Sequence, residues 1–161
     1  MINPLVSVCI PTYRGSLFLK AAIDSVLSQT YQNFEIFVLD DNSPDDTEVI
    51  VSSYSDRRVI YLRNSHNLGP EGNWNRCLEV ANGKYYKLLP HDDVLAQDCL
   101  EAQVSILEAD KAGEIALVFG SRKIIDPEGR TLMTRGLPRT QPGRIKSLEL
   151  IKRCIRAGTN L

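Results

Sequence analysis

The sequence lacks the features that mark a membrane-spanning or secreted protein. Its 161 residues contain no apolar run long enough to cross a bilayer. The first residues, Met1–Pro4, have no basic region that leads into an apolar one, so they do not indicate a secretory signal. We therefore expect a cytoplasmic protein, and the length suits one domain, residues 1–161, with a substantial core.

The four cysteines show no spacing that indicates a metal or redox motif. None of Cys9, Cys77, Cys99 and Cys154 belongs to a Cys-x-x-Cys pair, and each lies among apolar neighbours. We interpret them as reduced core residues. His66 has no second histidine or cysteine at ligand spacing, which argues against a metal role.

Charge is unevenly distributed along the chain. From Gly120 to the end there are 10 Lys and Arg against 3 Asp and Glu, whereas the preceding part has 9 against 17. The basic residues are dispersed and have no interleaved aromatics, so we expect no nucleic-acid partner. A solvated surface explains most of them, and contact with a diphosphate or with an anionic membrane surface is the alternative.

Apolar runs alternate with segments of helical periodicity. This alternation predicts an α/β fold, with a parallel sheet covered by helices on both faces. Strands are predicted at Leu5–Ile10, Phe34–Leu39, Val59–Leu62, Lys84–Leu89 and Ile115–Phe119. Helices are predicted over about Leu17–Gln29, from Ser43, through Trp74–Ala81, from Asp98 and over Ser147–Arg156.

Several local signals give these elements their expected ends. Pro11 is expected to end the first strand, and Ser43 to cap a helix. Trp74 begins an apolar face with Cys77, Leu78 and Ala81, which predicts a core or pocket-wall position. Asp126–Gly129 is typical of a hairpin turn, and the segment from there to Gly143 is expected to be mobile or ordered by a ligand.

Polar clusters follow three of the predicted strands. They are Thr12-Tyr13, Asp40-Asp41 and Asp92-Asp93. Because the carboxyl ends of parallel strands meet at one edge of a sheet, we expect these clusters to line one cleft. Adjacent carboxylates repel unless a cation or hydrogen bonds compensate them, so Asp92-Asp93 indicates a cation site. An exposed turn ahead of a helix is the alternative explanation for this pair.

At this level of detail the chain resembles the N-terminal nucleotide-binding portion of a family-two glycosyltransferase with the GT-A fold. That resemblance implies a Rossmann-like, mostly parallel sheet. The matching stretches are Val6–Tyr13, Ile23–Tyr31, Phe34–Thr47, Asn67–Gly69, Gly83–Tyr86 and His91–Asp93.

The resemblance also implies roles for individual residues. Pro11, Thr12 and Tyr13 would pack on the nucleotide base, and Asp41, with Asp40 as a weaker candidate, would contact base or ribose. Mg²⁺ or Mn²⁺ would be held on the diphosphate by Asp92 and Asp93. Oxygen ligands suit such a hard cation, which neutralises charge on a departing diphosphate. The nucleotide-binding set is Pro11, Thr12, Tyr13, Asp40, Asp41, Asn75, Arg76 and Asp92; the metal set is Asp92 and Asp93.

The sequence departs from the family pattern at two positions. Pro90 stands where the metal loop of the family often begins with Asp, so fewer protein ligands are expected. Trp74 stands where the family often has Arg, directly before Asn75, and Arg76 is a candidate substitute.

The implied activity is inverting, metal-dependent transfer of a sugar, most simply from a UDP-sugar, to an acceptor hydroxyl. Cell-surface polysaccharide or glycolipid synthesis, with a lipid-linked acceptor at the inner face of the membrane, is the expected setting. We expect the chain to be truncated before the acceptor-binding half, with the general base beyond Leu161.

Three other functions are weighed against this one. A catalytically incompetent nucleotide-sugar-binding or regulatory domain of the same fold is the main alternative. A sugar-nucleotide-forming nucleotidyltransferase is weaker, because the first strand is not followed by a Gly-rich basic loop. A P-loop phosphotransferase is disfavoured, because no Gly-x-x-x-x-Gly-Lys-Ser/Thr occurs.

Overall fold

The structure, a computed structural model, describes residues 4–136 and divides the chain into two compact units. The first unit ends at Ser105 and the second begins at Ile106, within helix α4 (Cys99–Ala109). A four-stranded sheet lies in the first unit, and a two-stranded sheet in the second. The first unit carries every residue predicted to bind nucleotide or metal.

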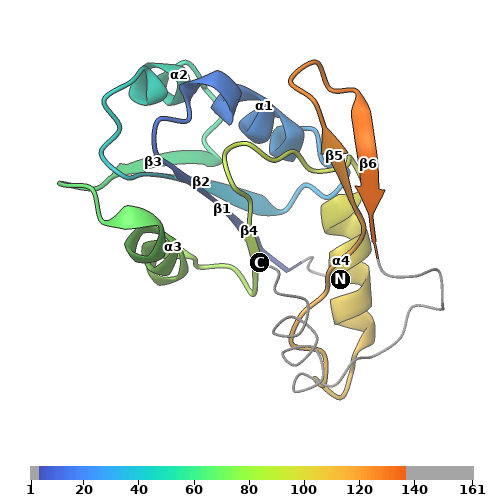
Figure 1. Ribbon diagram of the computed structural model, residues 1–161. Coiled ribbons are helices and arrows are strands. Elements are labelled where there is room, and N and C mark those ends of the chain that lie inside the picture. The colour runs from blue at the N-terminus through green and yellow to red at the C-terminus, as the bar shows by residue number, and fades with distance from the viewer. Residues whose placement is uncertain (1–3, 137–161) are drawn as a thin grey trace. The chain divides into compact units, whose positions relative to one another are not determined.

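The larger sheet is parallel throughout. Its strands are β1 (Val6–Thr12), β2 (Phe34–Asp40), β3 (Val59–Arg63) and β4 (Tyr85–Leu88), in the order β3-β2-β1-β4 (Figure 1). All residues of β1 and nearly all of β2 are buried, which explains why these two strands read as near-continuous apolar runs. The predicted α/β fold with a parallel sheet is confirmed.

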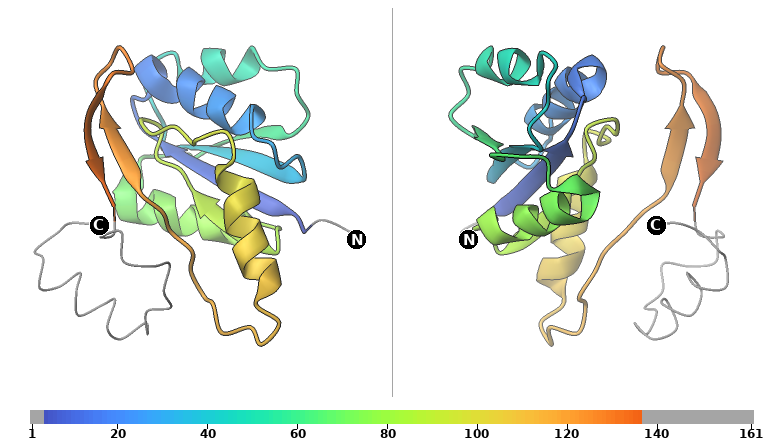
Figure 2. Two further views of the ribbon diagram at one scale, coloured as in Figure 1. Left: turned by 90° about the vertical axis from the view of Figure 1, so that its right-hand side faces the viewer. Right: turned by 60° about the vertical axis from the view of Figure 1, so that its left-hand side comes forward.

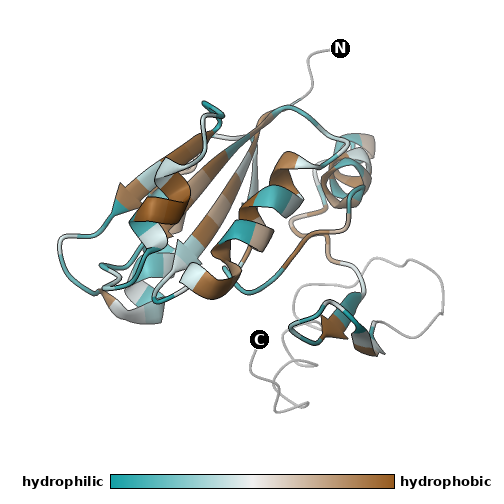
Figure 3. Cartoon of the chain, turned by 90° about the horizontal axis from the view of Figure 1, so that it is seen from above, coloured by the Kyte–Doolittle hydropathy of each residue, from teal (hydrophilic) through white to brown (hydrophobic). Residues whose placement is uncertain are grey.

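Helices cover both faces of this sheet. Figure 1 shows α1 (Ser16–Leu27) and α2 (Thr47–Ser52) on one face and α3 (Gly69–Val80) on the other. The α1 face holds the main core, whose buried members include Leu19, Ile23, Val26 and Ile36. Cys77 of α3 packs in a second cluster with Cys9, Phe37 and Leu39. Figure 3 shows apolar residues along the strands between these helices.

The start of α4 is tied to α1 through one buried amide. Gln29 is 1% exposed; its Nε2 donates to the carbonyl of Ala96 at 2.7 Å, and its Oε1 accepts from the amide of Leu100 at 3.0 Å. Leu100 and Val104 thereby join the core cluster on the α1 face. Between residues 4 and 136, none of the helices combines the length and apolar character that crossing a bilayer requires.

The first strand does not end at Pro11, as predicted. Pro11 and Thr12 remain paired with Leu39 and Asp40 of β2. The pairing of β1 with β4 stops at Cys9, so no ladder partner remains on that side for Pro11. Proline is tolerated here because its missing N–H costs no ladder hydrogen bond.

The second helix begins later than predicted. Ser43 is not its cap: α2 starts at Thr47, and the Ser43 hydroxyl instead accepts a hydrogen bond from the amide of Arg14 at 3.0 Å. Asp45 organises the helix start, because its Oδ1 accepts from the amide and the hydroxyl of Thr47 at 3.3 and 2.6 Å. Its Oδ2 accepts from the amide of Ser16 at 3.1 Å, which links the first turns of α2 and α1.

The buried stripe of α3 also differs from the prediction. Trp74 is 44% exposed and Leu78 is 59% exposed, whereas Asn73 and Cys77 are buried. The prediction placed the largest apolar side chain inward. The helix instead buries Asn73, a polar side chain whose amide finds hydrogen-bond partners on β2 and on the loop after β3.

The second unit, described to residue 136, contains an antiparallel pair of strands. These are β5 (Arg122–Ile125) and β6 (Thr131–Arg135), which run side by side in Figure 2. The hairpin turn predicted at Asp126–Gly129 is confirmed, with the Asp126 amide donating to the carbonyl of Arg130 at 3.0 Å. Part of the segment expected to be mobile therefore forms β6.

The prediction of a strand over Ile115–Phe119 was wrong. This run has no regular structure, and Leu117 and Phe119 are 64% and 43% exposed. Apolar β-prone residues form a strand only where another strand offers backbone partners, which the run lacks among the described residues. The helix predicted over Ser147–Arg156 lies outside the described residues.

Candidate nucleotide-sugar site

The carboxyl ends of all four parallel strands lie next to one another. The amide of Asp41 donates to the carbonyl of Thr12 at 2.9 Å, which joins the ends of β2 and β1. On the β3 side, the backbone N–H of Asn64 donates to the backbone carbonyl of Asp40 at 2.8 Å. On the β4 side, the backbone N–H of Leu89 donates to the backbone carbonyl of Cys9 at 2.9 Å. The three polar clusters therefore follow neighbouring strand ends, and the end of β3 joins them; that the clusters line one cleft stays a prediction.

The loop after β1 presents an aromatic ring beside a base. Tyr13 is 42% exposed, and the Arg14 guanidinium lies 5.3 Å from the centre of its ring. Arg14 has a positive φ of 54°, and its amide donates to the Ser43 hydroxyl. The loop is thus held to the end of β2 in a conformation that leaves the Tyr13 ring accessible. Such a ring suits stacking on a flat ligand.

Asp40 is fully buried, and both its carboxylate oxygens already have protein donors. Oδ1 accepts from the amide of Ser43 at 2.9 Å, and Oδ2 accepts from the hydroxyl of Tyr61 at 2.6 Å. Arg63 Nε lies 3.8 Å from Oδ2. Burial, and then the hydrogen bond to Asp40, raise the pKa of Tyr61 above its ordinary value. These contacts make Asp40 an anchor for the loop after β2, and its nucleotide role stays a prediction.

Asp41 is nearly buried but keeps one oxygen available. Its Oδ1 accepts from Asn64 Nδ2 and from the amide of Leu68, both at 2.8 Å. No described residue donates to its Oδ2. A ligand that brings an N–H or O–H group to this edge of the sheet would find an oriented carboxylate oxygen there.

The turn after β4 exposes the two adjacent aspartates. Asp92 and Asp93 are both exposed, and the Asp93 amide closes the turn on the carbonyl of Pro90 at 3.0 Å. His91 holds this turn against the end of β1, because its Nδ1 lies 3.4 Å from the carbonyl oxygen of Pro11. The Asp92-Asp93 pair therefore neighbours the loop that carries Tyr13.

These two carboxylates fit a divalent cation that takes its other ligands from elsewhere. Among residues 4–136, no cluster of three or more His, Cys, Asp or Glu forms a complete metal site. Mg²⁺ in phosphate-transfer sites is commonly held by one or two carboxylates together with substrate phosphates and water. Asp92 and Asp93 match that donor set.

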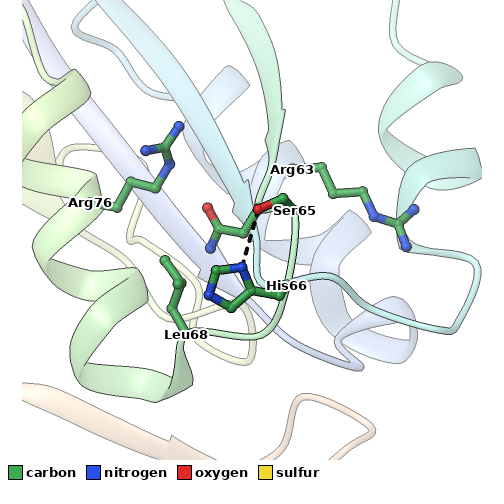
Figure 4. Close-up of a pocket in the computed structure, with 6 residues that line it drawn as sticks. Arg63, Ser65, His66, Leu68 and Arg76 are labelled. Carbon is green, nitrogen blue, oxygen red and sulfur yellow. Dashed lines mark hydrogen bonds between the residues drawn. The ribbon is translucent and has the colours of Figure 1, made fainter.

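A pocket of about 350 Å³ lies beside Asp41, at the end of β3 (Figure 4). It is lined by Arg63, Asn64, Ser65, His66, Leu68 and Arg76. Arg76 Nε is buried without a hydrogen-bond partner in the described structure. Of the two predicted residues on α3, Arg76 thus lines this pocket, whereas Asn75 is exposed. Trp74 lies about 200° around the helix from Arg76 and points elsewhere.

The sequence did not single out three residues that shape this edge. Asn64 and Asn73 bond each other beside Asp41, and Gly15 lies against His91. A usable signal was present for one of them: Asn64, with Ser65 and His66, forms a polar cluster directly after a predicted strand. For Asn73 and Gly15 the sequence carried no comparable signal.

Comparison with known proteins connects this geometry to a family. The sequence profile described as Glycosyl transferase family 2 matches residues 7–159. A glucosyltransferase of Escherichia coli, UDP-Glc:alpha-D-GlcNAc-diphosphoundecaprenol beta-1,3-glucosyltransferase WfgD, is 36% identical over 126 residues, which are 78% of this chain and 49% of that protein. The chain spans less than half of the length of the curated relatives compared with it, for example 49% of WfgD and 19% of an uncharacterized glycosyltransferase of Rickettsia bellii.

Solved structures show the same fold. TarS of S. aureus in complex with UDP superposes with a TM-score of 0.61 at 26% identity, over 65% of this chain and 32% of that one. The mannosyltransferase PcManGT of Pyrobaculum calidifontis, in complex with GDP-Man and Mn²⁺, gives 0.61 at 24% identity, over 80% and 37%. The parallel sheet, the polar strand ends and the profile match agree: this chain belongs to glycosyl transferase family 2 and has the GT-A fold.

Proposed function

We propose that this chain binds a nucleotide-activated sugar, most simply a UDP-sugar, for transfer to an acceptor hydroxyl. The observation that carries the proposal is the meeting of Tyr13, Asp41 and the Asp92-Asp93 turn at one edge of the sheet. The first offers a stacking surface, the second an oriented hydrogen-bond acceptor, and the third two carboxylates for a cation. A nucleotide-sugar presents a flat base, polar base edges and a dianionic diphosphate, which match these three features.

The structure supports the proposed nucleotide-binding residues to different degrees. Pro11 and Thr12 lie at the end of β1, directly before Tyr13. Asp41 is better placed than Asp40, because both oxygens of Asp40 are engaged. Arg76 supplies a guanidinium from the pocket beside Asp41. Asn75 and Asp92 complete the set.

A divalent cation, Mg²⁺ or Mn²⁺, would be held by Asp92 and Asp93. Bound there, it would neutralise the charge that develops on the leaving diphosphate. The structure of PcManGT with Mn²⁺ supports this choice of metal. TarS with UDP and the UDP-Glc named for the Escherichia coli relative support a UDP-sugar.

The reaction itself would be a single displacement with inversion. The acceptor hydroxyl loses its proton to a general base, its oxygen bonds to the anomeric carbon, and the nucleoside diphosphate leaves with the electrons of the broken bond. The described residues place no carboxylate as an evident base, and we propose that it lies outside them. The relative's diphosphoundecaprenol acceptor supports a lipid-linked saccharide, with peripheral membrane association and a role in polysaccharide or glycolipid synthesis.

Calorimetry with UDP in the presence and absence of Mn²⁺ tests the donor site. We expect wild-type protein to bind UDP more tightly with Mn²⁺, and Asp93→Ala to lose that enhancement. Asp98→Ala is the matched control, because it removes another exposed aspartate only five residues away. Absence of UDP binding by the wild type, or equal binding by Asp93→Ala, would refute the proposal.

A binding-only role, in which a domain of the same fold holds a nucleotide-sugar without transferring the sugar, is the second candidate. Incubation with UDP-glucose and a diphosphate-linked N-acetylglucosamine lipid separates the two. Sugar transfer by the 161-residue chain would exclude the binding-only role, whereas UDP binding without transfer would favour it.

A further inference from the structure

We propose that Asn64, held in place by Asn73, is a positioning residue that orients Asp41 for recognition of an N–H group on the nucleotide base. The proposal rests on the proposed function, since it names what fixes one of the donor-site residues. Neither asparagine needs to touch the nucleotide for this role. What carries the proposal is a buried chain of hydrogen bonds that ends on Asp41.

The amide nitrogen of Asn64 uses both of its hydrogens within the protein. Nδ2 lies 2.8 Å from Asp41 Oδ1 and 3.0 Å from Asn73 Oδ1. A side-chain amide has two N–H donors, so these two acceptors account for both. Asn64 is 5% exposed, which leaves little water to compete for either bond.

Asn73 fixes the orientation of the Asn64 side-chain amide, that is, which of its two ends faces Asp41. Its own Nδ2 donates to the carbonyl of Leu39 on β2 at 3.0 Å, which turns its Oδ1 toward Asn64. An acceptor in that position is satisfied only if Asn64 presents its NH₂ group. The NH₂ group therefore also faces Asp41, and Asn64 cannot turn its carbonyl toward the carboxylate without breaking both bonds.

Among the described residues, Asp41 consequently accepts side-chain hydrogen bonds on one carboxylate oxygen only, Oδ1. Asn64 Nδ2 and the amide of Leu68 both donate to Oδ1, and the backbone amide of Asp41 is fixed on the Thr12 carbonyl. These bonds set the plane of the carboxylate and leave Oδ2 without a donor among the described residues. The preorganised oxygen fits a base that presents an N–H, as uracil does at N3 and cytosine does not.

The test compares UDP with N3-methyl-UDP, which lacks that hydrogen, by calorimetry in Mn²⁺. We expect wild-type protein to prefer UDP. Asn64→Ala should weaken UDP binding by about tenfold or more, the effect of losing hydrogen bonds to a charged group, and leave N3-methyl-UDP within about twofold. The ratio of the two affinities is the decisive quantity, because partial unfolding of a variant lowers both equally.

Two further variants sharpen the test. Asn73→Ala leaves Asn64 in place but frees its amide, so we expect the preference for UDP to fall less than in Asn64→Ala. Asn82→Ala is the matched control: this exposed asparagine follows α3, and its side-chain amide donates to the carbonyl of Val80, away from Asp41. An unchanged affinity ratio in Asn64→Ala, or the same loss in Asn82→Ala, would overturn the proposal.

Hydrogen exchange of the Leu68 amide, measured by NMR without nucleotide, examines the same network separately. Loss of Asn64 should let the Asp41 carboxylate rotate, so exchange at Leu68 should become faster in Asn64→Ala and stay unchanged in Asn82→Ala. If wild-type protein binds neither nucleotide, the proposed function fails, but the exchange measurement still tests the positioning role. Unchanged exchange of the Leu68 amide in Asn64→Ala would reject that role.

Discussion

A Cβ atom placed on Gly15 would lie 2.7 Å from Cδ2 of His91, closer than real Cβ atoms approach other heavy atoms. The loop after β1 and the turn that carries Asp92 therefore meet at a point that only glycine fits. The same Cβ would lie 2.3 Å from the hydroxyl oxygen of Thr12. The loop that carries Tyr13 and the turn that carries Asp92 and Asp93 thus meet at one crowded contact.

Gly15→Ala should disturb both stability and the donor site. Relief of the overlap must move the His91 ring or the loop, which typically costs about 1–3 kcal/mol in the free energy of unfolding. Urea denaturation measures that loss, and calorimetry should show weaker binding of UDP with Mn²⁺. Gly120→Ala is the control, since a Cβ there meets nothing within 4 Å. Equal stability of the two variants would contradict the crowding.

Tyr61→Phe should destabilise the fold, because it removes the hydroxyl that donates to Oδ2 of the buried Asp40 at 2.6 Å and leaves Arg63 Nε, at 3.8 Å, as the nearest described cation. We expect a loss of about 1–3 kcal/mol, measured by chemical denaturation. Tyr54→Phe provides the comparison, because the Tyr54 hydroxyl donates to Asp24, whose carboxylate is about half exposed. Its loss should be smaller, since water replaces the missing donor.

Thr12→Val should leave the stability of the free protein unchanged or raise it. The Thr12 hydroxyl is buried and has no hydrogen-bond partner within the described structure, so a methyl group of the same shape removes an unsatisfied polar atom. Thr47→Val, at another buried threonine, should instead cost about 1 kcal/mol, since that hydroxyl donates to Asp45 at 2.6 Å. Paired thermal denaturation of the two variants checks the contrast.

The ion pair between Asp56 and Arg58 should add to the free energy of unfolding, and this contribution should be lost in acid. Arg58 donates side-chain and backbone hydrogen bonds to Asp56, which lower the pKa of that carboxyl to about 2. A lowered pKa in the folded state stabilises the fold above the unfolded value of about 3.9, and the contribution disappears as the pH falls toward 2. The difference in unfolding free energy between wild type and Asp56→Asn should therefore be constant above about pH 5 and vanish near pH 2. A difference that does not vary with pH would be inconsistent with this pair.

Cys9 and Cys77 should resist alkylation in the native protein. Both are fully buried, and a hydrogen bond with Cys77, followed by burial, raises the pKa of the Cys9 thiol far above its ordinary value. Cys99 is only half-buried and should react before Cys9 and Cys77. Peptide mapping after iodoacetamide treatment, with and without denaturant, measures each rate. Native labelling of Cys9 as fast as Cys99 would contradict the structure.

Much of the fold followed from local patterns in the sequence. The runs that became β1 and β2 are apolar on both faces, and the stripe Leu19, Ile23 and Val26 marked α1 correctly. The errors arose where a partner strand or helix face decided the outcome. Pro11 remained in β1 because no ladder exists on its β4 side, and Ile115–Phe119 found no described strand to pair with.

For the candidate site, too, some features could be predicted from the sequence and others depend on the tertiary structure. The sequence by itself determined which residue types follow the strands, because acids and aromatics at the ends of parallel strands can be read from periodicity alone. Only the tertiary structure decided that Asp40 is enclosed by Tyr61 and Ser43. It also decided that Asn73, Asn64 and Asp41 form one chain of hydrogen bonds, and that one Asp41 oxygen has no donor among the described residues. The physical reason is that a hydrogen bond between residues far apart in sequence depends on how elements pack, and no local pattern contains that packing.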